Sequence, residues 1–175
     1  MLDIKKISII TVFAAACVVT NYALAGIPNV SLMDFIVFIS GFSFGPVVGA
    51  SIGVLGWAVY GVINPYGFLL PIYLATMFVE SIYGIVGGLI GKSIASTDLE
   101  GQHVKLGVLF GLFACILTLI YDIITNVVFA MTFKIPIILG ILFGVPFMFI
   151  HVFSNIAFFS LGSIPVLKAI RKMLG

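Results

Sequence analysis

Six runs of apolar residues fill nearly the whole chain, from Ile7 to Val166, and they constrain the fold more than any motif does. A helix that crosses a bilayer needs roughly 20 apolar residues, so six short-turned spans use up a chain of 175 residues. Composition agrees, because 62% of the residues are hydrophobic and 8% are charged, values far outside the range of soluble globular proteins. We therefore expect an all-α polytopic membrane protein, a single six-helix bundle over residues 1–175.

Glycine, proline and polar residues separate the six runs and set their predicted boundaries. The second run is the shortest, because its residues rise only about 20 Å along a helix, whereas the hydrocarbon core is about 30 Å thick. We expect that helix to be tilted, kinked or incomplete. The polar stretch 92–105 is predicted to be a solvated loop. The predicted spans are 7–25, 32–44, 46–63, 68–90, 106–131 and 137–161.

Basic residues are distributed unequally between the two predicted faces of the membrane. If the chain crosses six times, both termini and seven of its eight Lys and Arg residues lie on one side, and only Lys134 lies on the other. Cytoplasmic loops carry an excess of Lys and Arg, so both termini are predicted to be cytoplasmic. This distribution is an orientation signal and not a nucleic-acid interface. A cleavable signal peptide that ends near Ala25 is the alternative for the first run.

Three acids, and no Lys or Arg, lie within the predicted spans. An ionisable group in hydrocarbon costs about 2.5 to 3.5 kcal/mol on insertion scales, so it normally faces a polar cavity, a partner or a transport path. Polar and aromatic residues recur around these acids at spacings of three and four, which predicts a pocket that opens outward. The candidate substrate-binding residues are Asp34, Trp57, Tyr60, Glu80, Tyr83, Tyr121, Asp122, Asn126, His151 and Asn155.

Several of these residues also have a structural explanation. Trp57 is as well explained by packing as by ligand contact, and Asp34 is also suited to capping a helix near the outer surface. His151 and Asn155 lie four residues apart and are well suited to a hydrogen bond between helices. Glu80 and Asp122 lie deepest in their spans and are the stronger candidates.

Small residues recur every four positions in most of the spans. Such spacing lets membrane helices pack closely. A further patch of small residues, Thr11, Ala14 and Ala15, lies on the first span and predicts either internal packing or docking on another membrane subunit. The recurring glycines are Gly45, Gly49 and Gly53, Gly84 and Gly88, Gly87 and Gly91, Gly107 and Gly111, and Gly140 and Gly144.

The segment from Gly41 to Pro46, Gly-Phe-Ser-Phe-Gly-Pro, is followed by Gly49 and Gly53. It resembles the segment that joins helices two and three in many substrate-binding S components of energy-coupling factor (ECF) transporters, and the resemblance covers nearly the whole chain. It implies a prokaryotic cell-membrane subunit that captures a small water-soluble vitamin or related micronutrient at the outer face. The implied partners are a coupling transmembrane subunit and two ABC ATPases.

Two features differ from relatives in this family. The docking motif of the family's first helix is Ala-x-x-x-Ala, and its best match here is Thr11-x-x-x-Ala15. The relatives that transport nickel or cobalt carry an N-terminal histidine motif, whereas this chain has no histidine before His103. The sequence therefore predicts docking through the Thr11 face, and it predicts no metal site and no cofactor.

Charge gives one indication about the substrate. Acids without a base inside the spans favour a neutral or cationic ligand over a free carboxylate, which ordinarily binds Arg or Lys. We expect a heteroaromatic vitamin or precursor that stacks on Trp57 and tyrosines, with Glu80 or Asp122 orienting a donor group.

Two other classes of protein stay open from the sequence. One is a stand-alone ion-coupled secondary transporter for a small neutral or cationic solute, in which Glu80 and Asp122 exchange protons. No inverted repeat, frequent in such carriers, is evident between the halves. The other is an intramembrane enzyme that uses His151 with an acid, but one histidine supplies neither a metal cluster nor an activated nucleophile. The sequence therefore predicts no enzyme and no catalytic residue.

Overall fold

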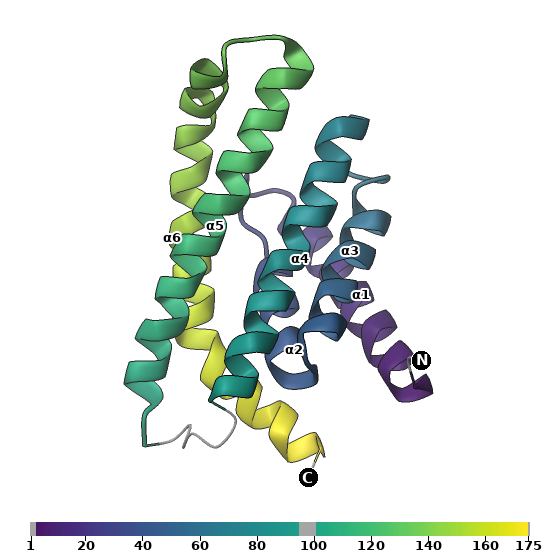
Figure 1. Cartoon of the computed structure of the whole chain (residues 1–175), viewed down its shortest axis with the longest axis vertical. Helices are drawn as coiled ribbons and strands as arrows, with labels where there is room; N and C mark the ends of the chain where they lie inside the picture. The colour runs from purple at the N-terminus through teal and green to yellow at the C-terminus, as the bar shows by residue number, and fades with distance from the viewer. Residues whose placement is uncertain (1–2, 95–100, 175) are drawn as a thin grey trace.

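The computed structural model describes residues 3–94 and 101–174. In that part of the chain the protein forms six α-helices and no strand (Figure 1). Both chain ends lie in the lower part of the molecule in Figure 1, opposite the turn that joins the last two helices. The helices are α1 (Ile4–Leu24), α2 (Met33–Phe44), α3 (Pro46–Tyr60), α4 (Leu70–Ser93), α5 (His103–Phe133) and α6 (Ile137–Leu174).

Each predicted apolar run forms one helix, but several of the observed helix ends differ from the predicted ones. The third helix ends at Tyr60, where a hydrogen bond from the Gly61 amide to the Trp57 carbonyl closes its last turn. The predicted loop 92–105 is shorter, because α4 continues to Ser93 and α5 begins at His103; residues 95–100 lie outside the described part of the chain.

The last helix runs well past its predicted end at residue 161. Ile164, Leu167 and Ile170 repeat every third residue, and all three are buried in the hydrophobic core. This apolar stripe continues the helix through Pro165, although a proline inside a helix removes a backbone hydrogen bond. In Figure 1 the yellow C-terminal part of α6 runs at an angle to the rest of the helix.

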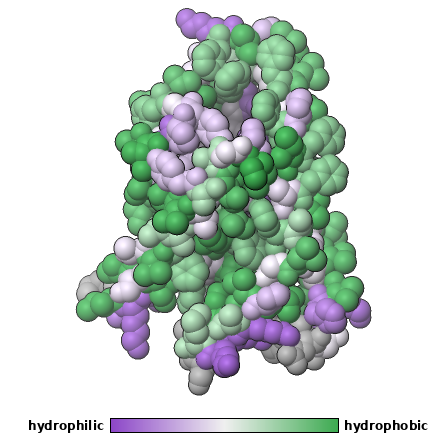
Figure 2. Space-filling view, turned by 180° about the vertical axis from the view of Figure 1, so that it is seen from behind, coloured by the Kyte–Doolittle hydropathy of each residue, from purple (hydrophilic) through white to green (hydrophobic). Residues whose placement is uncertain are grey.

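Two of the six helices are shorter than a bilayer span. By length and hydropathy, α1, α4, α5 and α6 are able to cross a membrane, whereas α2 and α3 have 12 and 15 residues. Apolar side chains cover most of the molecular surface, and strongly hydrophilic residues gather at its two ends (Figure 2). The surface is therefore suited to a lipid environment. The bundle includes two helices, α2 and α3, that are too short to cross a bilayer by themselves.

The shortest helix is the centre of the core. Nine of the twelve residues of α2 are buried. Phe38, near its middle, packs against Phe110 of α5 and Phe159 of α6, with ring centroids 5.8 and 5.0 Å apart. Because α2 is surrounded by protein, it does not need to match the thickness of the bilayer by itself.

Close glycine contacts hold α2, α3 and α4 together. A Cβ atom placed on Gly84 of α4 would overlap the backbone of Gly49 in α3, and one placed on Gly41 of α2 would overlap the backbone of Gly84. The prediction that glycines spaced by four allow tight packing is thus confirmed here. Gly45 has a different role, because its φ of 98° forms the sharp turn between α2 and α3.

Close contacts at glycine residues also join α5 to α6. A Cβ on Gly107 or Gly111 would collide with Ser160 of α6, and one on Gly140 or Gly144 would collide with α5. The last two helices therefore pack as a close antiparallel hairpin along most of their length (Figure 1).

Candidate functional site

A cavity of about 550 Å³ opens between the helices and two of their connecting loops. Its volume lies within the range of about 300 to 1,000 Å³ that is usual for small-molecule sites. The lining comes from the last turn of α1, the start of α2, the end of α3, the start of α4, the second half of α5 and the first half of α6. These segments all lie at the end of the bundle that faces away from the two chain termini.

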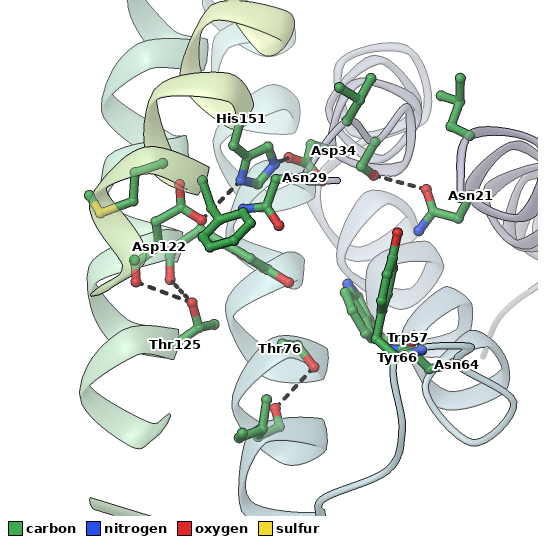
Figure 3. A pocket seen from close by; sticks show the side chains of 18 of the residues that line it. Asn21, Asn29, Asp34, Trp57, Asn64, Tyr66, Thr76, Asp122, Thr125 and His151 are labelled. Atoms are coloured by element: carbon green, nitrogen blue, oxygen red, sulfur yellow. Dashed lines mark hydrogen bonds and ion pairs between the residues drawn. The ribbon is translucent and has the colours of Figure 1, made fainter. Parts of the chain in front are cut away.

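His151 lies between two carboxylates in the wall of this cavity (Figure 3). Its Nε2 atom is 2.7 Å from Oδ2 of Asp34, and its Nδ1 atom is 3.0 Å from Oδ1 of Asp122. All three side chains are buried, and they join α2, α5 and α6. Both contacts are hydrogen bonds when the imidazole carries two protons, and the three groups then have a net charge of −1.

Asn155 extends this network into the bundle. Its Nδ2 atom donates to Oδ2 of Asp34 at 2.6 Å and lies 2.8 Å from the Oγ1 atom of Thr118. Tyr83 of α4 donates its hydroxyl to the same Thr118 oxygen at 3.0 Å. A continuous polar chain thus links the cavity wall with four helices, and apolar side chains enclose its inner part.

Trp57 and Glu80 form a second polar pair. The indole Nε1 of Trp57 donates to Oε2 of Glu80 at 3.1 Å. Trp57 is half-buried and lines the cavity, while Glu80 is completely buried one layer behind it. Tyr60 packs edge-on against the indole with a centroid distance of 5.4 Å.

The structure brings most of the predicted site residues together. Glu80, Tyr83 and Asn155 differ from the prediction, because they do not line the cavity but are buried behind its wall. Their side chains instead hydrogen-bond to Trp57, Thr118 and Asp34. The predicted residues that do line the cavity are Asp34, Trp57, Tyr60, Tyr121, Asp122, Asn126 and His151.

Several polar lining residues were not among the predicted site residues. Asn21 was the easiest to find, since it is a buried amide within an apolar span, and its Oδ1 accepts a hydrogen bond from Ser31 at 2.9 Å. The loop residues had no periodic signal, because their place depends on how the connections fold over the helix ends. These additional polar residues are Asn21, Asn29, Ser31, Asn64, Tyr66, Thr76 and Thr125.

Two tyrosines tie the connecting loops over the cavity. The hydroxyl of Tyr66 donates to the carbonyl of Ala25, and that of Tyr22 donates to the carbonyl of Ile63. The α1–α2 and α3–α4 connections are thereby fastened to each other at the open end of the bundle.

The predicted docking patch on α1 is split between two faces. Thr11 and Ala15 are exposed, whereas Ala14 is buried with only 4% of its surface accessible, so the structure corrects its assignment to an outer face. Ala14 lies on the side of α1 that packs into the bundle. Thr11 borders a shallow apolar groove between α1 and α3, which also includes Pro46, Ala50 and Val54.

One comparison with known proteins bears on this site. The profile of a family described as ECF-type riboflavin transporter, S component, matches residues 1–172. The chain belongs to this family. It is therefore a membrane-embedded, multi-pass S component, in a family of transporter subunits and not of enzymes. No curated protein and no solved structure gave a significant match.

Proposed function

We propose that this S component captures riboflavin in the cavity at the outer end of the bundle and delivers it to an ECF-type importer. The observation that carries the proposal is the cavity itself, which combines aromatic rings with a few buried polar groups. The riboflavin transporter family to which the chain belongs names the ligand class to test.

The lining is chemically suited to a flat, uncharged heteroaromatic ligand. Aromatic side chains from three helices and a loop offer stacking surfaces, among them Trp57, Tyr60, Tyr66 and Tyr121. Asp122 and the nearby amides offer hydrogen-bond partners for the imide and hydroxyl groups of riboflavin. None of the described lining residues is Lys or Arg, so the cavity is a poor match for a carboxylate or phosphate ligand.

An outward-facing cavity follows from six membrane crossings with both termini in the cytoplasm. The cavity lies at the end opposite the termini, the end that carries Lys134. The other seven Lys and Arg residues lie near the termini or in the adjoining ends of α4 and α5, so positive charge favours this orientation. The short helix α2 then lies within the bundle, while α3 packs against α1, α2 and α4 and exposes Val47, Leu55 and Val59 on its outer face.

The partners in this proposal are a coupling transmembrane subunit and two ABC ATPases, in the cell membrane of a prokaryote. Thr11 and Ala15 give α1 a face without bulky side chains, and the neighbouring groove is apolar. Small residues at this spacing permit a helix of another subunit to approach closely. Docking through this face leaves the cavity, at the opposite end of α1, free for substrate.

Binding is tested directly with purified protein. We expect the chain, extracted in detergent from cells grown with riboflavin, to retain riboflavin that mass spectrometry identifies. After removal of that ligand, riboflavin should quench the fluorescence of Trp57, whereas thiamin should not. Absence of riboflavin binding to folded protein would contradict the proposed substrate. A different retained molecule would then become the substrate to test.

Transport separates this proposal from a stand-alone carrier. We expect vesicles that contain the chain with its coupling subunit and ATPases to accumulate riboflavin when ATP is supplied. Vesicles with the chain alone should not accumulate it under an imposed proton gradient. Accumulation by the chain alone contradicts the proposal of a subunit that depends on ATPases.

A further inference from the structure

Glu80 is a buried acid that the binding proposal does not use directly. It has no accessible surface, and it faces the cavity only through Trp57. Its Oε2 atom accepts the indole hydrogen bond, while Oε1 has no hydrogen-bond partner within the described part of the chain. Asp34 is a second acid in the neighbourhood of Glu80. A buried carboxyl group with a single donor is costly, which suggests that this position requires an acceptor.

Glu80 is closely packed against α3, the helix that carries Trp57. Gly53 lies one turn before Trp57 on α3, and a Cβ there would come within 3.2 Å of the Glu80 Cγ atom and backbone. That separation is tighter than an ordinary contact, so a side chain at residue 53 would push Glu80. Tyr60 supports the indole from its other end through an edge-on ring contact. The indole is thus held by Glu80 from α4 and by Tyr60 from α3.

We propose that Glu80 is a positioning residue, whose carboxyl group fixes the orientation of the Trp57 indole in the cavity wall. The inference rests on the proposed function, since the oriented indole is the stacking surface for a planar ligand such as riboflavin. An indole N–H that faced the cavity would instead be available to polar ligand atoms. Glu80 therefore acts on the ligand only through Trp57.

The first experiment needs no ligand. Trp57 is the only tryptophan in the chain, so the emission of the purified protein reports on this side chain. Glu80→Met keeps the length of the side chain but removes the acceptor, and Glu80→Gln keeps an acceptor. We expect Glu80→Met to shift the emission maximum and to change quenching by acrylamide, and Glu80→Gln to stay close to the unmodified protein.

A matched control removes another hydrogen bond between the same helices. Tyr73 of α4 donates its hydroxyl to the carbonyl of Ala58, the residue after Trp57 in α3, at 3.2 Å and not to the indole. Tyr73→Phe should leave the Trp57 emission unchanged. If Glu80→Met does not fold, Gly53→Ala provides a second test, because its Cβ displaces Glu80 and should also shift the emission.

The second experiment measures riboflavin affinity by quenching of flavin fluorescence. Because oriented aromatic contacts contribute about 0.5 to 1.5 kcal/mol, Glu80→Met should weaken binding roughly three- to tenfold. Glu80→Gln should restore most of the affinity. In a Trp57→Phe background, Glu80→Met should have no further effect, since the group that it positions is absent.

The two proposals fail in different ways. If the unmodified protein does not bind riboflavin, the proposed substrate is wrong, while the emission of Glu80→Met still decides whether Glu80 holds the indole. Unchanged emission in Glu80→Met would falsify the positioning role. So would an equal loss of affinity with and without Trp57, because Glu80 would then act on the fold and not through the indole.

Discussion

At the scale of single residues, the most consequential side chain is His151. It is buried between the carboxylates of Asp34 and Asp122, which come from two other helices. Removal of one residue from a buried group of ionised side chains leaves the remaining charges without a partner. The loss of stability then exceeds the net stability that the complete group contributed. His151 therefore holds together both the cavity wall and the contact between α2 and α6.

Substitution of His151 tests whether its side chain stabilises the cavity wall and the contact between α2 and α6. Because His151→Leu leaves Asp122 without its donor among the described residues and Asp34 with Asn155 as its remaining donor, it should lower the free energy of unfolding by about 3 to 5 kcal/mol. Thermal unfolding in detergent measures the loss. A variant that also carries Asp34→Asn and Asp122→Asn has no charged group left at these three positions and should recover part of the stability. A combined variant that is less stable than His151→Leu would contradict this explanation.

The ionisable residues were also the candidates whose place in the cavity wall was easiest to expect from the sequence. Asp34, Asp122 and His151 stand out in apolar spans, and the structure places all three in the cavity wall. Glu80 gives the same signal, yet it lies behind Trp57. Helical spacing tells which side of a helix a residue occupies, but not which neighbour covers that side. The depth of Glu80 depends on packing between α3 and α4.

At the scale of helices, the contact between α3 and α4 depends on glycine. A Cβ on Gly84 would overlap the backbone of Gly49 and Ala50, and backbone atoms cannot move aside as a flexible side chain can. Gly84→Ala should therefore destabilise the protein by at least the 1 to 3 kcal/mol or so that is typical of overpacking.

A glycine outside the bundle provides the control for this prediction. Among the described residues, no atom lies within 4 Å of a Cβ placed on Gly26, so Gly26→Ala should change stability by less than about 0.5 kcal/mol. The two melting temperatures are compared in the same detergent. Equal melting temperatures would show that the helices move apart easily and that the close contact is unimportant.

The exposed face of α1 gives a prediction about assembly. A bulky residue at Ala15 should prevent close approach of another helix, so Ala15→Leu should reduce co-purification with the coupling subunit and ATPases while riboflavin binding persists. Ala157 is exposed on α6, and Ala157→Leu is the matched control that should leave assembly intact. Normal assembly of Ala15→Leu would direct the search for the docking face to another helix.

At the scale of the whole molecule, the orientation in the membrane is testable with single cysteines. Cys17 and Cys115 are first replaced by alanine, so that Lys134→Cys or Lys172→Cys carries the only thiol. In intact cells a membrane-impermeant maleimide should label residue 134, whereas residue 172 should react only after permeabilisation. Labelling of both residues from outside, or of residue 172 alone, would contradict six crossings with cytoplasmic ends.

The sequence predicted the six helices because each apolar run has the length and boundaries of a helix. It did not show that α2 is the centre of the core, since a short apolar run has the same composition whether it faces lipid or protein. The continuation of α6 was missed because Pro165 and the basic residues after it indicate a helix end, while the stripe of Ile164, Leu167 and Ile170 that packs on the core sustains the helix. The loops over the cavity depend on tertiary contacts such as that between Tyr66 and Ala25.

The separation along the chain between Asp34 and its partners has a consequence for biosynthesis. His151 follows Asp34 by 117 positions, and Asn155 follows it by 121. While the ribosome is still making the last helix, α2 is a short apolar segment with an acid that has no donor, so it is a poor candidate to enter the bilayer by itself. Stable insertion of α2 should wait until α6 is synthesised, and nascent chains truncated before residue 151 should be substrates for membrane proteases.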